Sequence, residues 1–161
     1  TVAIEVGLII ACLLFMRRMA ETTDVKVISD EIDPNLESEL SSGNLEHLTI
    51  PQGVEVYEIN GPYFFGAGNR FEEIMTSFGD RPKVRIIRMR KVPFVDSTGI
   101  HNLTNLCIMS KKEGIHIVLS GVNDKVNSQL QKADFYKLIG EENICSHINI
   151  ALERAKEIIA E

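Results

Sequence analysis

The segment Val92–Leu103, with the sequence V-P-F-V-D-S-T-G-I-H-N-L, constrains the fold more than any other part of this chain. An apolar run ends in an acid, two adjacent hydroxyl side chains and a glycine, and a helix-like pattern follows at once. This order predicts a buried strand that stops in a turn and continues as a helix. Four residues are then expected at the helix N-terminus, namely Asp96, Ser97, Thr98 and Gly99.

The chemistry of this turn leaves two interpretations open. Unpaired backbone N–H groups and the positive end of the helix dipole favour a phosphate or another anion at a helix N-terminus. Ser97 and Thr98 are therefore candidates for modification, regulation or anion contact, with Asp96 and Gly99 beside them. Asp, Ser and Thr are also ordinary N-cap residues, and capping is the more common role of these residue types.

The rest of the chain alternates between strand-like and helix-like segments. Expected strands are Val54–Ile59, Tyr63–Phe65 after an Asn60-Gly61-Pro62 turn, Val84–Met89 extended by Val92–Val95, and Ile115–Leu119. Expected helices are Phe71–Phe78, Gly99–Lys112, Val122–Ala133 and Ile148–Ile159. This alternation predicts an α/β fold with a largely parallel sheet, to which the opening hairpin adds an antiparallel edge.

The first residues have a different character. Val2–Met16 are apolar on every helical face apart from Glu5, and Arg17 and Arg18 follow immediately. Sixteen helical residues span only about 24 Å, less than the ~30 Å hydrocarbon core of a bilayer. We interpret residues 1–20 as the end of a last transmembrane helix and its exit on the cytoplasmic side, where Lys and Arg are enriched. The alternative is a buried core helix of a soluble protein.

Residues 21–53 carry most of the net charge. Residues 21–50 contain eight acidic side chains and one basic one, a charge of −7, so the net charge of −6 leaves about +1 for the remainder. We predict an acidic tether with one short helix around Pro34–Leu40, followed by a folded domain over residues 54–161. A nearly neutral domain gives no reason to expect nucleic-acid binding.

Several patterns that could indicate a cofactor or a reaction are weak. The three cysteines are far apart and the four histidines lack ligand spacing, so we expect no metal site. Gly66–Phe71 resembles the start of a dinucleotide fingerprint but has Phe where the third small residue belongs. Arg81–Lys91 contains six basic residues, which we interpret as solvated charges along a strand. No paired carboxylates or Ser-His-Asp set indicates an enzyme.

The combined pattern resembles the STAS domain. The segments that carry the resemblance are Val54–Ile59, Gly61, Phe64–Ala67 and above all Val92–Gly99, and the similarity extends over about Gly53–Ala160. STAS domains occur in bacterial anti-sigma-factor antagonists and in the cytoplasmic tails of SulP (sulfate permease) anion transporters. The resemblance implies a mixed, mostly parallel sheet of four to five strands flanked by helices.

Within this resemblance, Ser97 matches the serine that a partner kinase phosphorylates in the antagonists, Asp96 the neighbouring acid and Gly99 the turn glycine. The transporter branch is also similar upstream, because an apolar helix, the F-M-R-R-M-A exit at Phe15–Ala20 and a tether precede the domain. Ile87–Arg90 is transporter-like as well, whereas many antagonists have an acid near Arg88.

We therefore expect the cytoplasmic regulatory domain of a SulP-type secondary transporter of sulfate, bicarbonate or a dicarboxylate, located at the inner (plasma) membrane. The expected partners are its own transmembrane transport domain, a second copy in a homodimer and a cytosolic regulatory protein. The alternative is a soluble anti-sigma-factor antagonist switched by phosphorylation of Ser97. We expect no cofactor, with a nucleotide or anion at the Ser97 helix N-terminus as a weaker alternative.

Overall fold

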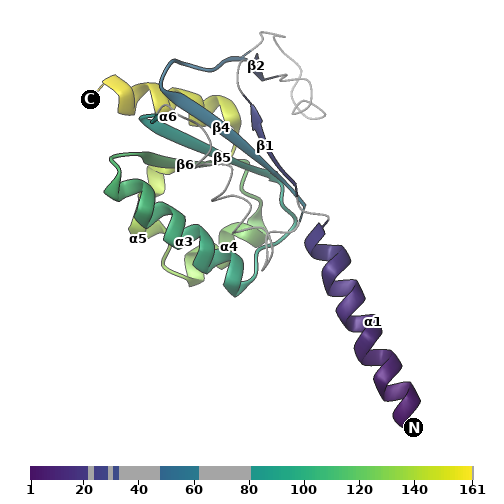
Figure 1. Ribbon diagram of the computed structural model, residues 1–161. Helices are drawn as coiled ribbons and strands as arrows, with labels where there is room; N and C mark the ends of the chain where they lie inside the picture. Colours follow the sequence, from purple (N-terminus) through teal and green to yellow (C-terminus); the bar gives the residue numbers. More distant parts are fainter. Residues whose placement is uncertain (22–23, 29–30, 33–47, 62–80, 161) are drawn as a thin grey trace.

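The computed structural model describes residues 1–21, 24–28, 31–32, 48–61 and 81–160. Helix α1 (Val2–Glu21) extends away from the sheet and the other helices (Figure 1). Its large apolar side chains between Val2 and Met16 are exposed on all sides. Within the described ranges, no helix is both long enough and apolar enough to cross a membrane.

A five-stranded mixed sheet forms the centre of the domain, in the order β1-β4-β5-β6-β7. Its strands are β1 (Asp24–Ile28), β4 (Val54–Asn60), β5 (Val84–Lys91), β6 (His116–Ser120) and β7 (Ile144–Cys145). Strand β1 runs antiparallel to β4, and β4 through β7 are parallel to one another. A separate antiparallel pair joins β2 (Glu31–Ile32) to β3 (Leu48–Thr49).

Helices cover both faces of this sheet (Figure 1). Helices α3 (Ser97–Lys112), α4 (Asp124–Lys132) and α5 (Tyr136–Ile139) lie on one face, and α6 (Ile148–Ala160) lies on the other. On the α3 face, side chains such as Tyr57, Ile87, Leu103 and Leu119 form one core cluster. On the α6 face, the second cluster contains Val56, Ile86, Val118, Ile148, Ala151, Leu152 and Ala155. Because helices cover both faces, most positions of the central strands β4, β5 and β6 are buried, including several charged ones.

The structure confirms the expected fold class and most of the expected elements. The strands predicted at Val54–Ile59, Val84–Met89 and Ile115–Leu119 are β4, β5 and β6. The helices predicted at Gly99–Lys112, Val122–Ala133 and Ile148–Ile159 are α3, α4 and α6, with ends that differ by one or two residues. The predictions for Pro34–Leu40, Tyr63–Phe65, Gly66–Phe71 and Phe71–Phe78 fall outside the described residues.

Three details differ from the expectation. The segment Val92–Val95 does not extend β5, because the strand ends at Lys91 and Val95 makes only an isolated bridge. The antiparallel edge strand in the described structure is β1, which lies within the range predicted to be a tether. Helix α5 and the two-residue strand β7 had no counterpart in the prediction. The tether's other residues and the boundaries at 20 and 53 stay predictions.

Candidate functional site

The turn between β5 and α3 is anchored by two buried valines. Val92 is fully buried and its N–H donates to the Met89 carbonyl oxygen at 2.9 Å, which folds the chain back at the end of β5. Val95 is also buried, whereas Pro93 and Phe94 between them are exposed. The segment therefore holds the turn against the core while presenting Phe94, which is 43% exposed, to solvent.

Asp96 caps the helix. Its backbone is extended, with φ −91° and ψ 178°, and its Oδ1 accepts a hydrogen bond of 2.7 Å from the Gly99 N–H. Helix α3 thus begins at Ser97, two residues earlier than predicted. Of the two roles left open for this turn, capping belongs to Asp96. Ser97 and Thr98 are the first two helical residues, where N–H groups have no intrahelical acceptor.

The four residues of the turn differ in exposure. Ser97 is exposed, Thr98 is half-buried, and Gly99 is buried on the inner face of α3 together with Leu103. The first turn of α3 contains no acidic side chain, so the charge nearest to Ser97 in the sequence is the Asp96 carboxylate. The structure therefore leaves the Ser97 hydroxyl accessible, and the candidate phosphoacceptor role of Ser97 and Thr98 stays a prediction.

Helix α4 begins beside this turn. Its N-cap, Asn123, accepts from the Val126 N–H through Oδ1 and donates through Nδ2 to the Val92 carbonyl oxygen at 2.8 Å. The same side chain therefore starts α4 and ties it to the β5–α3 connection. Asn123 was not predicted as a cap, because the helix was expected to begin at Val122, although an Asn just before a helix is a common N-cap signal.

An open cleft of about 450 Å³ lies between the turn and α4. Phe94 and Val95 line it on one side, and Asp124, Lys125, Ser128 and Gln129 line it on the other. Both helices begin at the carboxyl ends of parallel strands, which is the side of an α/β sheet where ligands and partners commonly bind. The cleft combines an exposed aromatic ring with charges of both signs, which suits a protein partner better than a small anion.

Three of the six basic side chains in the run Arg81–Lys91 pair with carboxylates on the neighbouring strand. Arg85 and Arg88 are buried, and each pairs with a carboxylate directly across on β4: Arg85 Nε with Glu55 at 3.4 Å and Arg88 Nη1 with Glu58 at 2.9 Å. Lys91 Nζ lies 2.6 Å from the other Glu58 oxygen. The interpretation of these charges as solvated was therefore wrong for both arginines, because the neighbouring strand places a half-buried carboxylate, Glu55, opposite Arg85 and a buried one, Glu58, opposite Arg88.

Two cysteines lie in the core. Cys107 and Cys145 are buried free thiols, whereas Cys12 on α1 is exposed. Burial raises the pKa of Cys107 to about 12, and it also raises the pKa of Cys145, with a smaller opposing effect from Arg154. Both buried thiols therefore stay protonated at neutral pH, and a thiol in that state is a poor nucleophile.

Comparison with known proteins agrees with this architecture. The family model described as "STAS domain" matches residues 47–151. A sulfate transporter family protein from Wolinella succinogenes is 40% identical, with a TM-score of 0.67, and the match covers 71% of this chain and 93% of that one. The SulP transporter STAS domain from Vibrio cholerae is 39% identical, with a TM-score of 0.63 and coverage of 70% and 89%.

Full-length relatives are much longer than this chain. The Bacillus subtilis protein YvdB is 25% identical over 147 residues, which are 91% of this chain but 26% of YvdB. A putative anti-sigma-factor antagonist from Thermotoga maritima is also among the structural neighbours, with 18% identity and a TM-score of 0.57, which shows a shared fold alone. The chain belongs to the STAS domain family and carries a STAS domain of the SulP transporter type.

Proposed function

We propose that this chain is the cytoplasmic regulatory and interaction domain of a SulP-type secondary anion transporter, with α1 as the end of its last membrane helix. The transport domain would belong to the same polypeptide, since the match covers only 26% and 27% of the curated relatives' own length. The substrate class would be sulfate, bicarbonate or a dicarboxylate. The domain itself would bind and regulate, without catalysing a reaction or holding a cofactor.

The observation that carries this proposal is the exposed apolar surface of α1. Ten large apolar side chains between Val2 and Met16 are 49% to 76% exposed. Moving them out of water is favourable by on the order of 15 kcal/mol, at roughly 1.5 kcal/mol or more for each side chain. A contiguous apolar surface of this extent indicates a membrane or protein partner. Lipid together with neighbouring membrane helices satisfies this requirement, and Arg17 and Arg18 would mark the water interface.

Liposome flotation of the 161-residue chain tests the membrane part. We expect the chain to float with vesicles and the double variant Ile9→Asp, Leu13→Asp to stay at the bottom of the gradient. The matched control carries the same change to Asp at Met109 and Ile150, which are also about half exposed but lie on α3 and α6. This control variant should still float. A parent chain that does not float, or one whose α1 variant floats equally well, contradicts the proposal.

Transport by the complete gene product tests the regulatory part. Proteoliposomes should take up labelled sulfate, bicarbonate or a dicarboxylate, and substitutions in the exposed turn before α3, Phe94→Asp in the cleft or Ser97→Glu at the start of the helix, should change the uptake rate. Lys112→Met, on the last turn of α3, is the control that should not. Absence of uptake for every anion argues against the transporter assignment. Uptake rates that are the same in Phe94→Asp, Ser97→Glu and the parent argue against regulation through this turn.

A second candidate function is a phosphorylation switch at Ser97, as in the antagonist branch. It is favoured by one observation: Ser97 is exposed while Asp96 does the capping, so a phosphate on Ser97 would not break the cap. The added charge of about −1.5 to −2 would act on a docked partner. Incubation with ATP and cell extract, followed by intact-mass measurement of the parent, Ser97→Ala and Thr98→Ala chains, tests it. A mass gain that survives Ser97→Ala assigns the modification elsewhere.

A further inference from the structure

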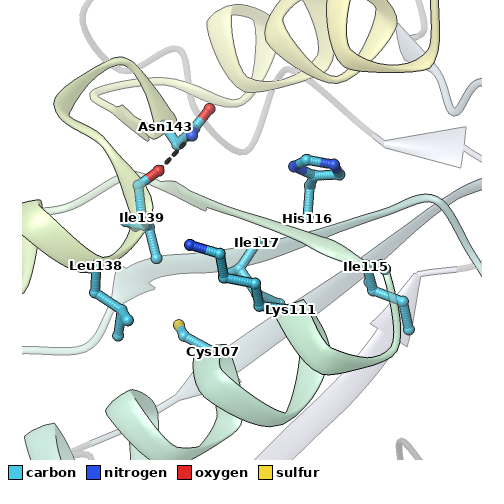
Figure 2. A pocket seen from close by; sticks show the side chains of 9 residues that line it. Cys107, Lys111, Ile115, His116, Ile117, Leu138, Ile139 and Asn143 are labelled. Atoms are coloured by element: carbon cyan, nitrogen blue, oxygen red, sulfur yellow. Dashed lines mark hydrogen bonds between the residues drawn. The ribbon is translucent and has the colours of Figure 1, made fainter. Parts of the chain in front are cut away.

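A second hollow lies on the α3 face of the sheet, away from the Ser97 turn. It has a volume of about 200 Å³ and is formed by the end of α3, the first half of β6 and the segment from α5 to Asn143 (Figure 2). Strand β7 pairs only with Leu119 and Ser120, so among the described strands the first half of β6 has no neighbour on this side. The hollow therefore occupies the place where a longer β7 would continue the sheet.

The floor of this hollow and the wall on the α5 side are apolar. Ile115, Ile117 and Cys107 form its buried floor, and Leu138 and Ile139, both half-buried, line the α5 side. The Cys107 thiol is neutral at physiological pH, because its burial raises its pKa to about 12. The floor thus offers no charge and no strong hydrogen-bonding group to a bound molecule.

One charged side chain enters the hollow. Lys111 reaches in from α3 with its amine directed toward Ile139, while the ring of His116 points to the other side of β6 (Figure 2). Within the described part of the chain, Lys111 has no ion-pair partner, and no acidic side chain lines the hollow. Asn143 at the far end is already engaged, since it donates to the Ile139 carbonyl oxygen at 2.5 Å and accepts from Arg154 at 2.9 Å.

We infer that this hollow binds a small organic monocarboxylate, with its apolar body on Ile117 and Ile139 and its carboxylate on Lys111. An apolar cavity of about 150 Å³ holds a benzene molecule, so about 200 Å³ accommodates a body of roughly six carbon atoms with room for the head group. Lys111 is exposed at the mouth, where it can meet a carboxylate without being buried unpaired. The site lies apart from the Ser97 turn and does not depend on the proposed transporter role.

Methyl-selective NMR of the 161-residue chain in lipid nanodiscs tests this inference, with hexanoate as the ligand. We expect saturable shifts of the Ile117 and Ile139 methyl signals. Lys111→Met keeps the apolar stem and removes the charge, so it should raise the Kd by about fivefold or more. Lys112→Met is the matched control, because Lys112 is exposed on the same helix and does not line the hollow, and its Kd should stay within about twofold.

Two further measurements separate charge recognition from apolar adsorption. 1-Hexanol has the same chain without the carboxylate, and it should bind more weakly than hexanoate. Leu138→Trp fills the hollow from its half-buried rim and should abolish the shifts while leaving the remaining methyl spectrum folded. Absence of saturable shifts at Ile117 and Ile139, equal binding of hexanol, or an unchanged Kd in Lys111→Met overturns the inference.

Discussion

Replacing Arg88 by Met should destabilise the domain more than any exposed charge substitution. Arg88 is 3% exposed, and its Nη1 lies 2.9 Å from Glu58 Oε2 on the neighbouring strand. The variant removes one partner of a buried ion pair and leaves the Glu58 carboxylate, whose residue is 7% exposed, without its buried counter-charge. Breaking a buried pair in this way costs about 3–5 kcal/mol.

The structure places the expected cost at the lower end of that range. Lys91 Nζ lies 2.6 Å from Glu58 Oε1, and the Lys91 side chain is about half exposed, so it can still neutralise Glu58 after the substitution. We therefore expect a loss of about 3 kcal/mol in the free energy of unfolding. For a domain of this size, the loss corresponds to a decrease in Tm of roughly 10 °C.

Urea unfolding followed by circular dichroism measures this loss, with Arg90→Met as the matched control. Arg90 lies on the same strand but is exposed, so its replacement should change stability by less than about 0.5 kcal/mol. The double variant Glu58→Gln, Arg88→Met should lose less stability than the sum of the losses in the two single variants, because each single change leaves the other group buried without its partner. A loss below about 1 kcal/mol for Arg88→Met, or strict additivity in the double variant, would refute the reasoning.

Three further predictions concern turns, a cap and a buried thiol. Gly121→Ala should destabilise the domain more than Gly114→Ala. Both glycines have positive φ, but an added Cβ at 121 would lie 3.1 Å from the β5 backbone, whereas one at 114 would face open space. Thermal unfolding should therefore show a loss of about 1 kcal/mol for Gly114→Ala and a larger loss for Gly121→Ala. Asp96→Ala should cost about 1 kcal/mol through loss of the α3 cap, measurable by the same method, and a loss below about 0.3 kcal/mol would contradict the capping role. The buried Cys107 thiol should make its full contribution to the free energy of unfolding below pH 9, where the thiol of the unfolded chain is also protonated. That contribution should disappear as the pH rises toward 12. Between pH 8 and pH 10.5, urea unfolding should therefore show a larger decrease in the free energy of unfolding for the parent than for Cys107→Ala.

Sequence periodicity predicted those elements whose side chains repeat over several turns or strand positions. Helix α6 is an example, since its buried residues Ile148, Ala151, Leu152, Ala155 and Ile158 recur at the three- to four-residue spacing of one helical face. Strand β7 has only two residues, too few to show a period, and it exists because Ile144 pairs with Leu119 on β6. Strand β1 does alternate, with Val25 and Val27 around Lys26, but the acidic composition of its surroundings obscured that pattern.

The ion pairs between β4 and β5 show why charge patterns alone mislead. Glu55 and Glu58 on β4 have the same spacing as Arg85 and Arg88 on β5, and the parallel register places them opposite each other. Because successive side chains alternate between faces, residues three apart point to opposite faces, so each face of the sheet receives one pair. The matching spacing is visible in the sequence, but its meaning depends on knowing that the two strands are neighbours and parallel.

The residue that caps α3 is likewise visible only in the structure. Asp96, Ser97 and Thr98 can each cap a helix, and the sequence could not distinguish them. In the structure, Asp96 caps the helix and Gly99 is buried against the core. Neither the capping hydrogen bond nor the packing of Gly99 involves the Ser97 hydroxyl. A charge added at Ser97 would therefore leave the cap intact and change the exposed surface at the start of α3. A modification of Ser97 would therefore act through a partner protein that contacts this turn.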